Sequence, residues 1–368
     1  MKIAFIGISG IKERSIDIRE TLVYEVATRL ISKYQIEVSV ICDKEFKKEC
    51  GLDEIEGIKL IYSKYSKRKN AIMFYHDSIY KARKESDIIY SFGFWGGLFS
   101  FLVPHNKVFV TNIDRILYKS SPNEKISNKL LKFFYHLSSK HSDILLCNSY
   151  SLEQYMIENY APKNTKVIEY GVNINPHLNQ ENHKTKSILK HYNLIKNNYH
   201  LVVASLQPQN SIDTIIQGYQ RSSRLYPLVI VGEIRKKLYY KKLKKIANLS
   251  VIIIDDIEHQ EDIDILRANA TSFIHGDTLG NVSHSLLEAM SAQKIILAHD
   301  NVFNREFLGE YGLYWRSPNE LNRVINKVEE TPLRYEKNIE YNYKRIITYY
   351  NWKNTSKRYY KLFKDISH

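Results

Sequence analysis

The fold of this chain is decided by the stretch His275-Gly276-Asp277-Thr278-Leu279-Gly280-Asn281-Val282-Ser283-His284-Ser285-Leu286-Leu287-Glu288-Ala289-Met290. The apolar run 270–274 that precedes it is typical of a buried strand, and the segment 285–290 is typical of the first turns of a helix. A strand, a turn with two glycines and a helix start present free backbone N–H groups and the positive end of the helix dipole to a ligand. Such a turn suits a diphosphate.

Glu288 lies one turn inside the expected helix. Its carboxylate could accept hydrogen bonds from a ribose diol, because an ionised carboxylate offers acceptors only. The alternative is an ordinary connection between a strand and a helix, with a glutamate that merely faces solvent. These residues by themselves leave both interpretations open.

The bulk composition limits the class of protein. A chain of 368 residues is too long for one compact core and predicts two domains, and 43% apolar residues exclude disorder. No apolar run is long enough to span a membrane, and segment 2–7 is expected to be a strand and not part of a signal peptide. Cys42, Cys50 and Cys147 lack the spacing of a metal site or a disulfide framework. We therefore expect a cytoplasmic protein without metal or cofactor.

The formal charge of +14, from 54 Lys and Arg against 40 Asp and Glu, points to an anionic partner. The basic cluster 235–245 is interrupted by Leu238, Tyr239 and Leu243, so it could be an amphipathic helix lying on anionic lipid. A solvated helix face is the alternative. No aromatic and basic signature of a nucleic-acid module is present, so nucleic acid is not an expected partner.

Short apolar runs alternate with longer amphipathic stretches along the whole chain. The expected strands are 2–7, 36–42, 58–63, 87–91, 107–111, 143–147, 166–169, 200–206, 227–232, 250–255, 271–275, 294–298 and 312–315. Expected helices include 18–33, 124–140, 150–159, 211–222, 236–247, 261–268, 284–292 and an aromatic tail at 349–363. This alternation predicts parallel sheets covered on both faces.

The alternation breaks in the Asn-, His- and Lys-rich stretch 174–198, which we interpret as a linker. We predict a Rossmann-like domain at 1–173, a second one at 199–340, and a C-terminal segment 341–368 whose helix packs back on the first domain. The fold class is therefore α/β, with two doubly wound domains facing each other across a cleft. Ligands are expected at the carboxyl ends of the strands.

Several motifs occur together along the chain. They are Leu266-Arg267-Ala268-Asn269-Ala270, the helix start 285–290, the segments 297–309 and 312–314, Tyr226–Gly232, Thr111–Asp114, Tyr170-Gly171 and Tyr350-Asn351-Trp352. In these motifs the sequence resembles glycosyltransferase family 4, whose members adopt the two-domain GT-B fold. The branch it resembles most contains rhamnosyltransferases of bacterial capsule and exopolysaccharide clusters. The resemblance covers nearly the whole chain and is stronger in the second half.

The resemblance implies a nucleotide-sugar donor, dTDP-rhamnose, held mainly by the second domain, and a lipid-linked oligosaccharide acceptor held mainly by the first. It implies that Glu288 binds the donor ribose and that backbone amides of the preceding loop cradle the diphosphate. The loop residues are Gly280, Asn281, Val282 and Ser283. His275 and Arg305 lie in matching segments. Arg305 is a candidate cation for the donor phosphate or, alternatively, half of an ion pair that fixes its loop.

Two loops depart from the family pattern. Ser205 stands where the family usually has an arginine that neutralises the diphosphate. Ser205 is a candidate for binding the sugar donor, but it cannot make the strong charge-assisted hydrogen bond that the arginine would make to the diphosphate. In the loop 7–17, which should approach the donor through Gly10, the paired glycines of the family are missing. Lys12, Arg14 or Arg115 could supply the missing charge.

The family retains anomeric configuration and uses no metal, so the resemblance implies a retaining, metal-independent transfer. Catalysis would depend on stabilising the diphosphate leaving group and positioning the acceptor hydroxyl. Asp114, just after a first-domain strand, could orient or deprotonate the acceptor, or it could only brace its loop.

Two other functions are weighed against transfer. A catalytically degenerate protein that partners or stabilises an active glycosyltransferase is favoured by Ser205 and opposed by Glu288. A nucleotide-sugar epimerase or dehydrogenase is disfavoured, because no Gly-x-Gly-x-x-Gly follows the first strand.

Overall fold

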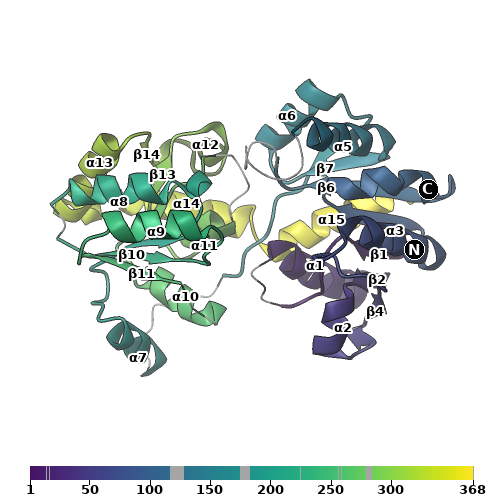
Figure 1. Ribbon diagram of the computed structural model, residues 1–368, viewed down its shortest axis with the longest axis horizontal. Coiled ribbons are helices and arrows are strands. Elements are labelled where there is room, and N and C mark those ends of the chain that lie inside the picture. The colour runs from purple at the N-terminus through teal and green to yellow at the C-terminus, as the bar shows by residue number, and fades with distance from the viewer. Residues whose placement is uncertain are drawn as a thin grey trace. The chain divides into compact units, whose positions relative to one another are not determined.

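The computed structural model describes residues 1–13, 15, 17–116, 128–174, 183–223, 225–255, 257, 259–278 and 284–367. Within this part the chain forms two compact units (Figure 1). The first consists of Met1–Gly171 with Trp352–His368, and the second of Val172–Asn351. Each unit is built on one sheet with helices packed against it.

The first unit contains a sheet that is parallel apart from one edge strand. Its strands are β1 (Lys2–Ile6), β2 (Glu37–Cys42), β3 (Glu54–Ile55), β4 (Ile58–Tyr62), β5 (Ile88–Phe92), β6 (Val108–Ile113), β7 (Ile144–Cys147) and β8 (Thr165–Val167). They are ordered β3-β4-β2-β1-β5-β6-β7-β8, with only β3 antiparallel to its neighbour. In the central register Ile3 lies opposite Val38 on one side and Ile88 on the other.

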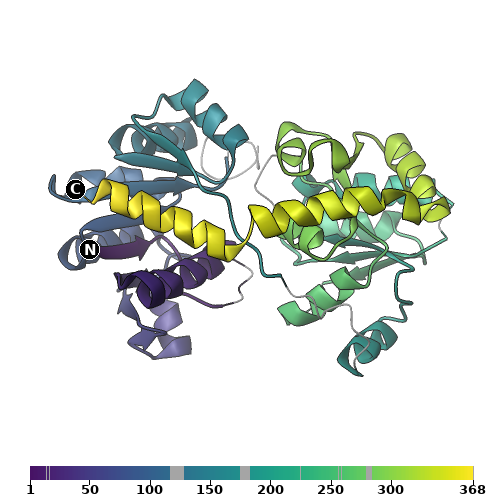
Figure 2. The same cartoon turned by 180° about the vertical axis from the view of Figure 1, so that it is seen from behind.

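Helices cover both faces of this sheet. They are α1 (Ile18–Tyr34), α2 (Lys44–Cys50), α3 (Ala71–Glu85), the 3-10 segment η1 (Phe94–Leu102), α5 (Asn128–His141), α6 (Tyr150–Tyr160) and α15 (Trp352–Ile366). Alternate side chains of β1 point to opposite faces of the sheet and so pack against different helices. Ala4 and Ile6 pack with Ile79 of α3, whereas Phe5 packs with Phe363 of α15. Figure 2 shows α15 in yellow beside α1, where Tyr360 stacks on Tyr34 at 3.7 Å between ring centroids.

The second unit has a fully parallel sheet. Its strands are β9 (His200–Val203), β10 (Leu228–Val231), β11 (Val251–Ile254), β12 (Ser272–His275), β13 (Ile295–His299) and β14 (Leu313–Trp315). The order is β11-β10-β9-β12-β13-β14, so the chain reverses its direction of growth between β9 and β12. Ligands of open parallel sheets bind beside such a reversal, at the carboxyl ends of the strands.

Helices also cover both faces of the second sheet. They are α7 (His183–His191), η2 (Pro208–Asn210), α8 (Ile212–Gln220), α9 (Lys237–Ile246), α10 (Gln260–Ala268), α11 (His284–Ser291), α12 (Val302–Leu308), η3 (Gly309–Tyr311), α13 (Pro318–Glu330), η4 (Pro332–Tyr335) and α14 (Glu336–Thr348). The core between the sheet and α8, α9 and α13 contains Ile215, Leu243, Ile325 and the buried Trp315. Helix α11 packs against α14.

The strands lie within three residues of their predicted bounds, except the two-residue β3, which was not predicted. The predicted linker 174–198 needs correction, because residues 183–191 form α7. Leu189 and Leu194 are buried, and the Lys184 ammonium lies 2.5 Å from the Glu261 carboxylate of α10. This part therefore belongs to the second unit, while residues 175–182 lie outside the described ranges.

The predicted C-terminal boundary at residue 341 is also wrong. Helix α14 is continuous to Thr348, with Ile346 buried, so residues 341–351 belong to the second unit. The tail helix begins at Trp352 and not at 349, because the Tyr350 carbonyl accepts a hydrogen bond from the Val172 N–H at 3.0 Å. That bridge holds the backbone before Trp352 out of helical geometry.

The basic cluster 235–245 contains helix α9. Its side chains Tyr239 and Leu243 are buried in the second unit, while Leu238 is 83% exposed among lysines. Two of the three apolar residues that were candidates for lipid contact therefore pack on the protein's own core. No helix in the described part of the chain has both the length and the apolar character needed to cross a membrane.

Candidate functional site

In the second unit, the loops that follow β9 and β12 are bonded to each other. The N–H and the hydroxyl of Thr278 both donate to the Gln209 carbonyl, each at 3.0 Å. A Cβ on Gly276 would lie 2.2 Å from the Asn210 carbonyl oxygen, so the two backbones approach as closely as only a glycine allows. This contact fixes the path of the chain beside the sheet reversal as far as Thr278.

Replacing Gly276 with alanine is expected to lower the free energy of unfolding by about 1–3 kcal/mol, the usual cost of overpacking. The obstacle is a backbone oxygen held by its own loop, so it cannot swing aside as a side chain could. Urea unfolding measures the effect. Thr278→Ser keeps both donors and is the control that should change stability little; equal stability of the two variants would contradict the close contact.

Glu288 lies on α11 and its carboxylate is surrounded by hydrogen-bond donors. Oε2 accepts from Nη2 of Arg267 at 2.7 Å, and Oε1 accepts from Nε2 of Gln260 at 3.4 Å. Nε2 of His284 lies 3.2 Å from Oε1. The Glu288 side chain is 18% exposed. The carboxylate is therefore oriented by these protein donors, and its hydrogen bonding to a ribose diol stays a prediction.

Arg267, on α10, is the site residue that sequence reasoning missed. It is 2% exposed and bridges two carboxylates, since its Nη1 lies 2.7 Å from Oδ1 of Asp264. Two sequence signals were present: Arg267 lies in the motif 266–270, and it follows an aspartate by three residues in a predicted helix. Nothing in the sequence pairs it with Glu288, which comes from the next helix.

Ser205, two residues after the end of β9, is part of a network of neutral groups. Its hydroxyl accepts from Nε2 of Gln207 at 2.9 Å, and its carbonyl accepts from Nδ2 of Asn210 at 2.7 Å. None of these partners is charged. At the position where the family pattern has an arginine, this loop is therefore held by the side-chain amides of Gln207 and Asn210.

His275 ends β12 and is 4% exposed. Burial, together with the nearby His299, lowers the pKa of its imidazole to about 4, so the ring is neutral at pH 7. Its Nε2 has no hydrogen-bond partner within the described part of the chain. A buried neutral ring with an unsatisfied nitrogen fits the predicted role in donor binding, which stays a prediction.

Arg305 pairs with Asp300 through both carboxylate oxygens, at 3.0 Å for Nη2–Oδ2, and its guanidinium lies 4.3 Å from the Tyr314 ring centroid. Arg316 also reaches Asp300, at 2.8 Å. The structure thus shows the loop-fixing alternative, and contact with a donor phosphate stays a prediction. The predicted diphosphate cradle, formed by Gly280, Asn281, Val282 and Ser283, lies outside the described residues. The candidate cation Arg14 also lies outside them.

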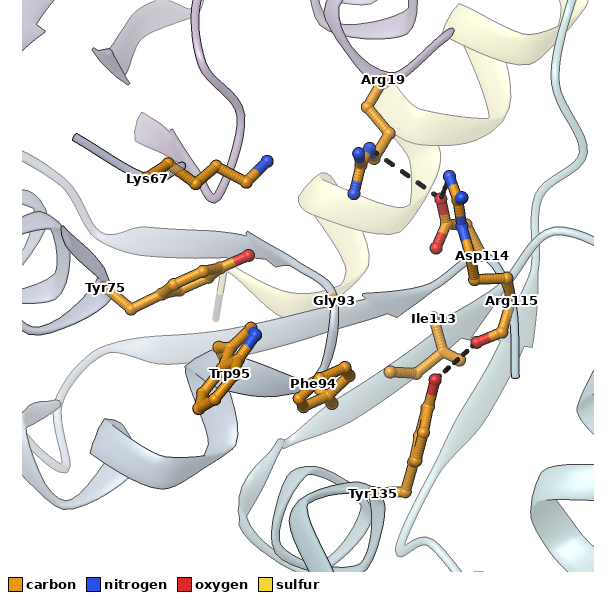
Figure 3. A pocket seen from close by; sticks show the side chains of 10 residues that line it. All are labelled: Arg19, Lys67, Tyr75, Gly93, Phe94, Trp95, Ile113, Asp114, Arg115 and Tyr135. Carbon is orange, nitrogen blue, oxygen red and sulfur yellow. Dashed lines mark hydrogen bonds and ion pairs between the residues drawn. The ribbon is translucent and has the colours of Figure 1, made fainter. Parts of the chain in front are cut away.

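The first unit has a pocket of about 190 Å³ at the carboxyl ends of β5 and β6, lined by ten residues (Figure 3). Gly93 directly follows β5, and Asp114 with Arg115 directly follows β6. Pockets for drug-sized ligands are larger, roughly 300–1,000 Å³, so this pocket has room for one small group and not for a nucleotide.

Asp114 lies in this pocket between two guanidinium groups. Its Oδ2 is 3.4 Å from Nη2 of Arg115 and 3.9 Å from Nε of Arg19. Burial alone would raise the pKa of Asp114, but Arg115 and Arg19 outweigh burial and lower it below its usual value. A carboxylate with a lowered pKa is a weak base. The geometry therefore favours orientation of a ligand by Asp114 over removal of a proton.

The two remaining candidates from the first loop lie elsewhere. A Cβ on Gly10 would be 2.3 Å from the Phe46 ring, and the Gly10 N–H donates to the Glu20 carboxylate at 3.2 Å. The structure thus gives Gly10 a packing contact with Phe46, and its predicted contact with the donor stays a prediction. Lys12 pairs with Glu49 at 3.8 Å on the surface. Of the three cations proposed to replace the missing arginine, Arg115 lines the pocket.

Comparison with known proteins identifies the fold and a partial match to a family model. Residues 185–345, within the second unit, match the family model described as glycosyl transferases group 1. No curated protein matches the sequence. Among solved structures, HepE of Anabaena in complex with UDP and glucose superposes with a TM-score of 0.79 at 17% identity, with 100% of both chains covered.

Two further solved structures match the fold of this chain over nearly its whole length. A glycosyltransferase from Rickettsia africae has a TM-score of 0.76 at 17% identity, covering 99% of this chain and 98% of its own. Sucrose-phosphate synthase from Thermosynechococcus elongatus has a TM-score of 0.78 at 13% identity, with the same coverage of 99% and 98%. The predicted fold class is confirmed: the chain has the GT-B fold.

Proposed function

We propose that this chain is a glycosyltransferase that takes its sugar from a nucleotide-sugar donor bound by the second unit. The observation that carries the proposal is the Glu288 carboxylate, held by Arg267 in the segment that matches the glycosyl transferases group 1 family. The neighbouring reversal of strand order between β9 and β12 is where open parallel sheets bind ligands. Glu288 takes the ribose diol, and the loop before α11 takes the diphosphate.

In the proposed reaction the bond between the anomeric carbon and the diphosphate oxygen breaks as the acceptor oxygen bonds to that carbon. The acceptor hydroxyl proton passes to the departing oxygen, and a nucleoside diphosphate leaves. The transfer retains anomeric configuration and uses no metal. Asp114 orients the acceptor hydroxyl, because its carboxylate is ionised and fixed by Arg115 and Arg19.

For the donor we propose dTDP-rhamnose, and for the acceptor a lipid-linked oligosaccharide of bacterial surface polysaccharide synthesis. Both follow from the resemblance of the sequence to the rhamnosyltransferase branch. A UDP-sugar is the competing donor, since HepE has been solved in complex with UDP-glucose. The enzyme would work in the cytoplasm, where the lysines of α9 could attract it to anionic lipid.

A second function is favoured by the neutral Ser205 loop. A transferase fold that lacks a cation beside the diphosphate could serve as a partner or stabiliser of an active transferase. Such a partner protein would not consume a donor.

Release of nucleoside diphosphate from dTDP-rhamnose, UDP-glucose and GDP-mannose tests the proposal and separates it from the alternative. We expect release from one of the three donors, and we expect EDTA to leave the rate unchanged. Release from dTDP-rhamnose selects the rhamnosyl donor, and release from UDP-glucose replaces it. No release from any donor by a folded protein, with or without added lipid-linked acceptor, would overturn catalysis and leave the partner function.

A further inference from the structure

The pocket of the first unit is lined by three cations and one carboxylate. The cations are Arg19, Lys67 and Arg115, and the carboxylate is Asp114. Arg19 is also bonded to Asp17, whose oxygens lie 2.8 Å from its Nε and 2.6 Å from its Nη2. Both guanidinium groups therefore have carboxylate partners behind or beside the pocket.

Lys67 differs from the two arginines. Its ammonium donates to the Gly7 carbonyl at 2.7 Å, and within the described part of the chain no carboxylate lies at ion-pair distance from it. Burial and the neighbouring Arg19 guanidinium lower the pKa of Lys67 to about 8. A partly buried ammonium without a counter-ion at ion-pair distance is costly, unless a ligand supplies the negative charge.

The opposite wall of the pocket is aromatic. Figure 3 shows Arg19 and Lys67 pointing into the space above Trp95, Phe94 and the hydroxyl end of Tyr75. Trp95 is held in place by Phe134, with ring centroids 4.9 Å apart. A flat aromatic face packs well against the apolar C–H face of a sugar ring, while the cations meet an anionic substituent.

We propose that this pocket binds an acceptor sugar that carries a phosphate or carboxylate group. The anionic group contacts Lys67 and Arg19, and the sugar ring lies on Trp95 with its hydroxyls near Asp114. The assignment of this ligand as the acceptor rests on the proposed function. The binding of an anion in the pocket does not depend on it. The small volume of about 190 Å³ favours one sugar over the nucleotide of the donor.

Binding of the anion should depend on pH through Lys67. The charged groups around its ammonium are Arg19, Asp17, Glu20 and Asp114. The anion binds the protonated ammonium, so the affinity for a carboxylate probe such as glucuronate is constant between pH 6 and 7 and falls as pH rises through about 8, by at most about tenfold per unit. Replacing Lys67 with glutamine should remove this dependence.

Calorimetric titration at pH 7 with glucose 6-phosphate, glucuronate, inorganic phosphate and glucose tests the pocket. Lys67→Gln keeps a donor for the Gly7 carbonyl, and Lys12→Gln, at a surface ion pair, is the matched control. We expect the phosphate and carboxylate probes to bind, glucose to bind at least tenfold more weakly, and Lys67→Gln to weaken the anionic probes at least tenfold. Lys12→Gln should behave as the unchanged protein, and thermal unfolding confirms that each variant is folded.

Several results would overturn the proposal. They are absence of binding of every anionic probe, glucose binding as tightly as glucose 6-phosphate, or equal affinities in the two variants. A UDP titration separates the two proposals. If Lys67→Gln weakens UDP as much as glucose 6-phosphate, the anion is the donor's diphosphate and the acceptor assignment fails. If glucose 6-phosphate binds as expected while no nucleotide binds, the pocket stands and the proposed function fails.

Discussion

Replacing Glu288 with glutamine is expected to weaken binding of the nucleotide-sugar donor by about ten- to a hundredfold. A hydrogen bond to a charged group contributes about 1.5–3 kcal/mol, and each 1.4 kcal/mol corresponds to about a factor of ten in affinity. Glutamine has the same shape, but an NH2 group that donates replaces one of the two oxygens that accept. It therefore cannot accept hydrogen bonds from both hydroxyls of a ribose diol through two oxygens. Calorimetric titration of both proteins with the donor that is consumed, or with its nucleoside diphosphate, measures the change.

The matched control is Glu330→Gln, at the exposed end of α13. It removes one negative charge from the same unit, so a general electrostatic effect would appear in both variants. We expect Glu330→Gln to keep its donor affinity within about twofold. Equal affinities for the two variants would show that Glu288 does not contact the donor.

Replacing Arg267 with methionine is expected to lower the free energy of unfolding by about 3–5 kcal/mol, the usual cost of breaking a buried ion pair from one side. Arg267 is 2% exposed and neutralises Asp264 and Glu288 together, so methionine leaves two carboxylates without their cation. Urea unfolding measures the loss. Donor affinity should fall as well, because the Glu288 carboxylate is no longer held in one orientation.

A double variant tests whether the two residues act together. Removing the charge of Glu288 in the Arg267→Met background should cost less than in the unchanged protein, with a coupling of about 0.5–3 kcal/mol. Arg305→Met is the control for loss of an arginine, since Arg305 pairs with Asp300 at an exposed position and should cost about 1 kcal/mol or less. Strict additivity of the Arg267 and Glu288 effects would contradict the pairing.

The regular structure of both units could be predicted from the sequence because it is encoded locally. Apolar runs such as 228–231 and 295–299 are buried on both faces, and that is why they are nearly continuous. Gly276 and Glu288 could be found for the same reason, since a strand, a glycine turn and a helix start follow each other in the chain. The limits of the linker could not, because α7 is polar and is held by contacts with α10.

The partners within each site could not be predicted. Arg267 and Glu288 are 21 residues apart, and Lys67 reaches the Gly7 carbonyl 60 residues away. Such pairs depend on how strands are ordered in the sheet, which the local pattern does not specify. At Gly10 the resemblance suggested an approach to the donor, and the local pattern gave no sign of the close contact with the Phe46 ring.

A crystal structure with bound nucleoside diphosphate tests the donor site most directly. We expect the ribose hydroxyls within hydrogen-bond distance of the Glu288 carboxylate, with Arg267 still paired to it on the other side. A nucleotide bound away from α11 in a fully occupied crystal, with the Glu288 carboxylate contacting only protein groups, would contradict the proposed function of this unit.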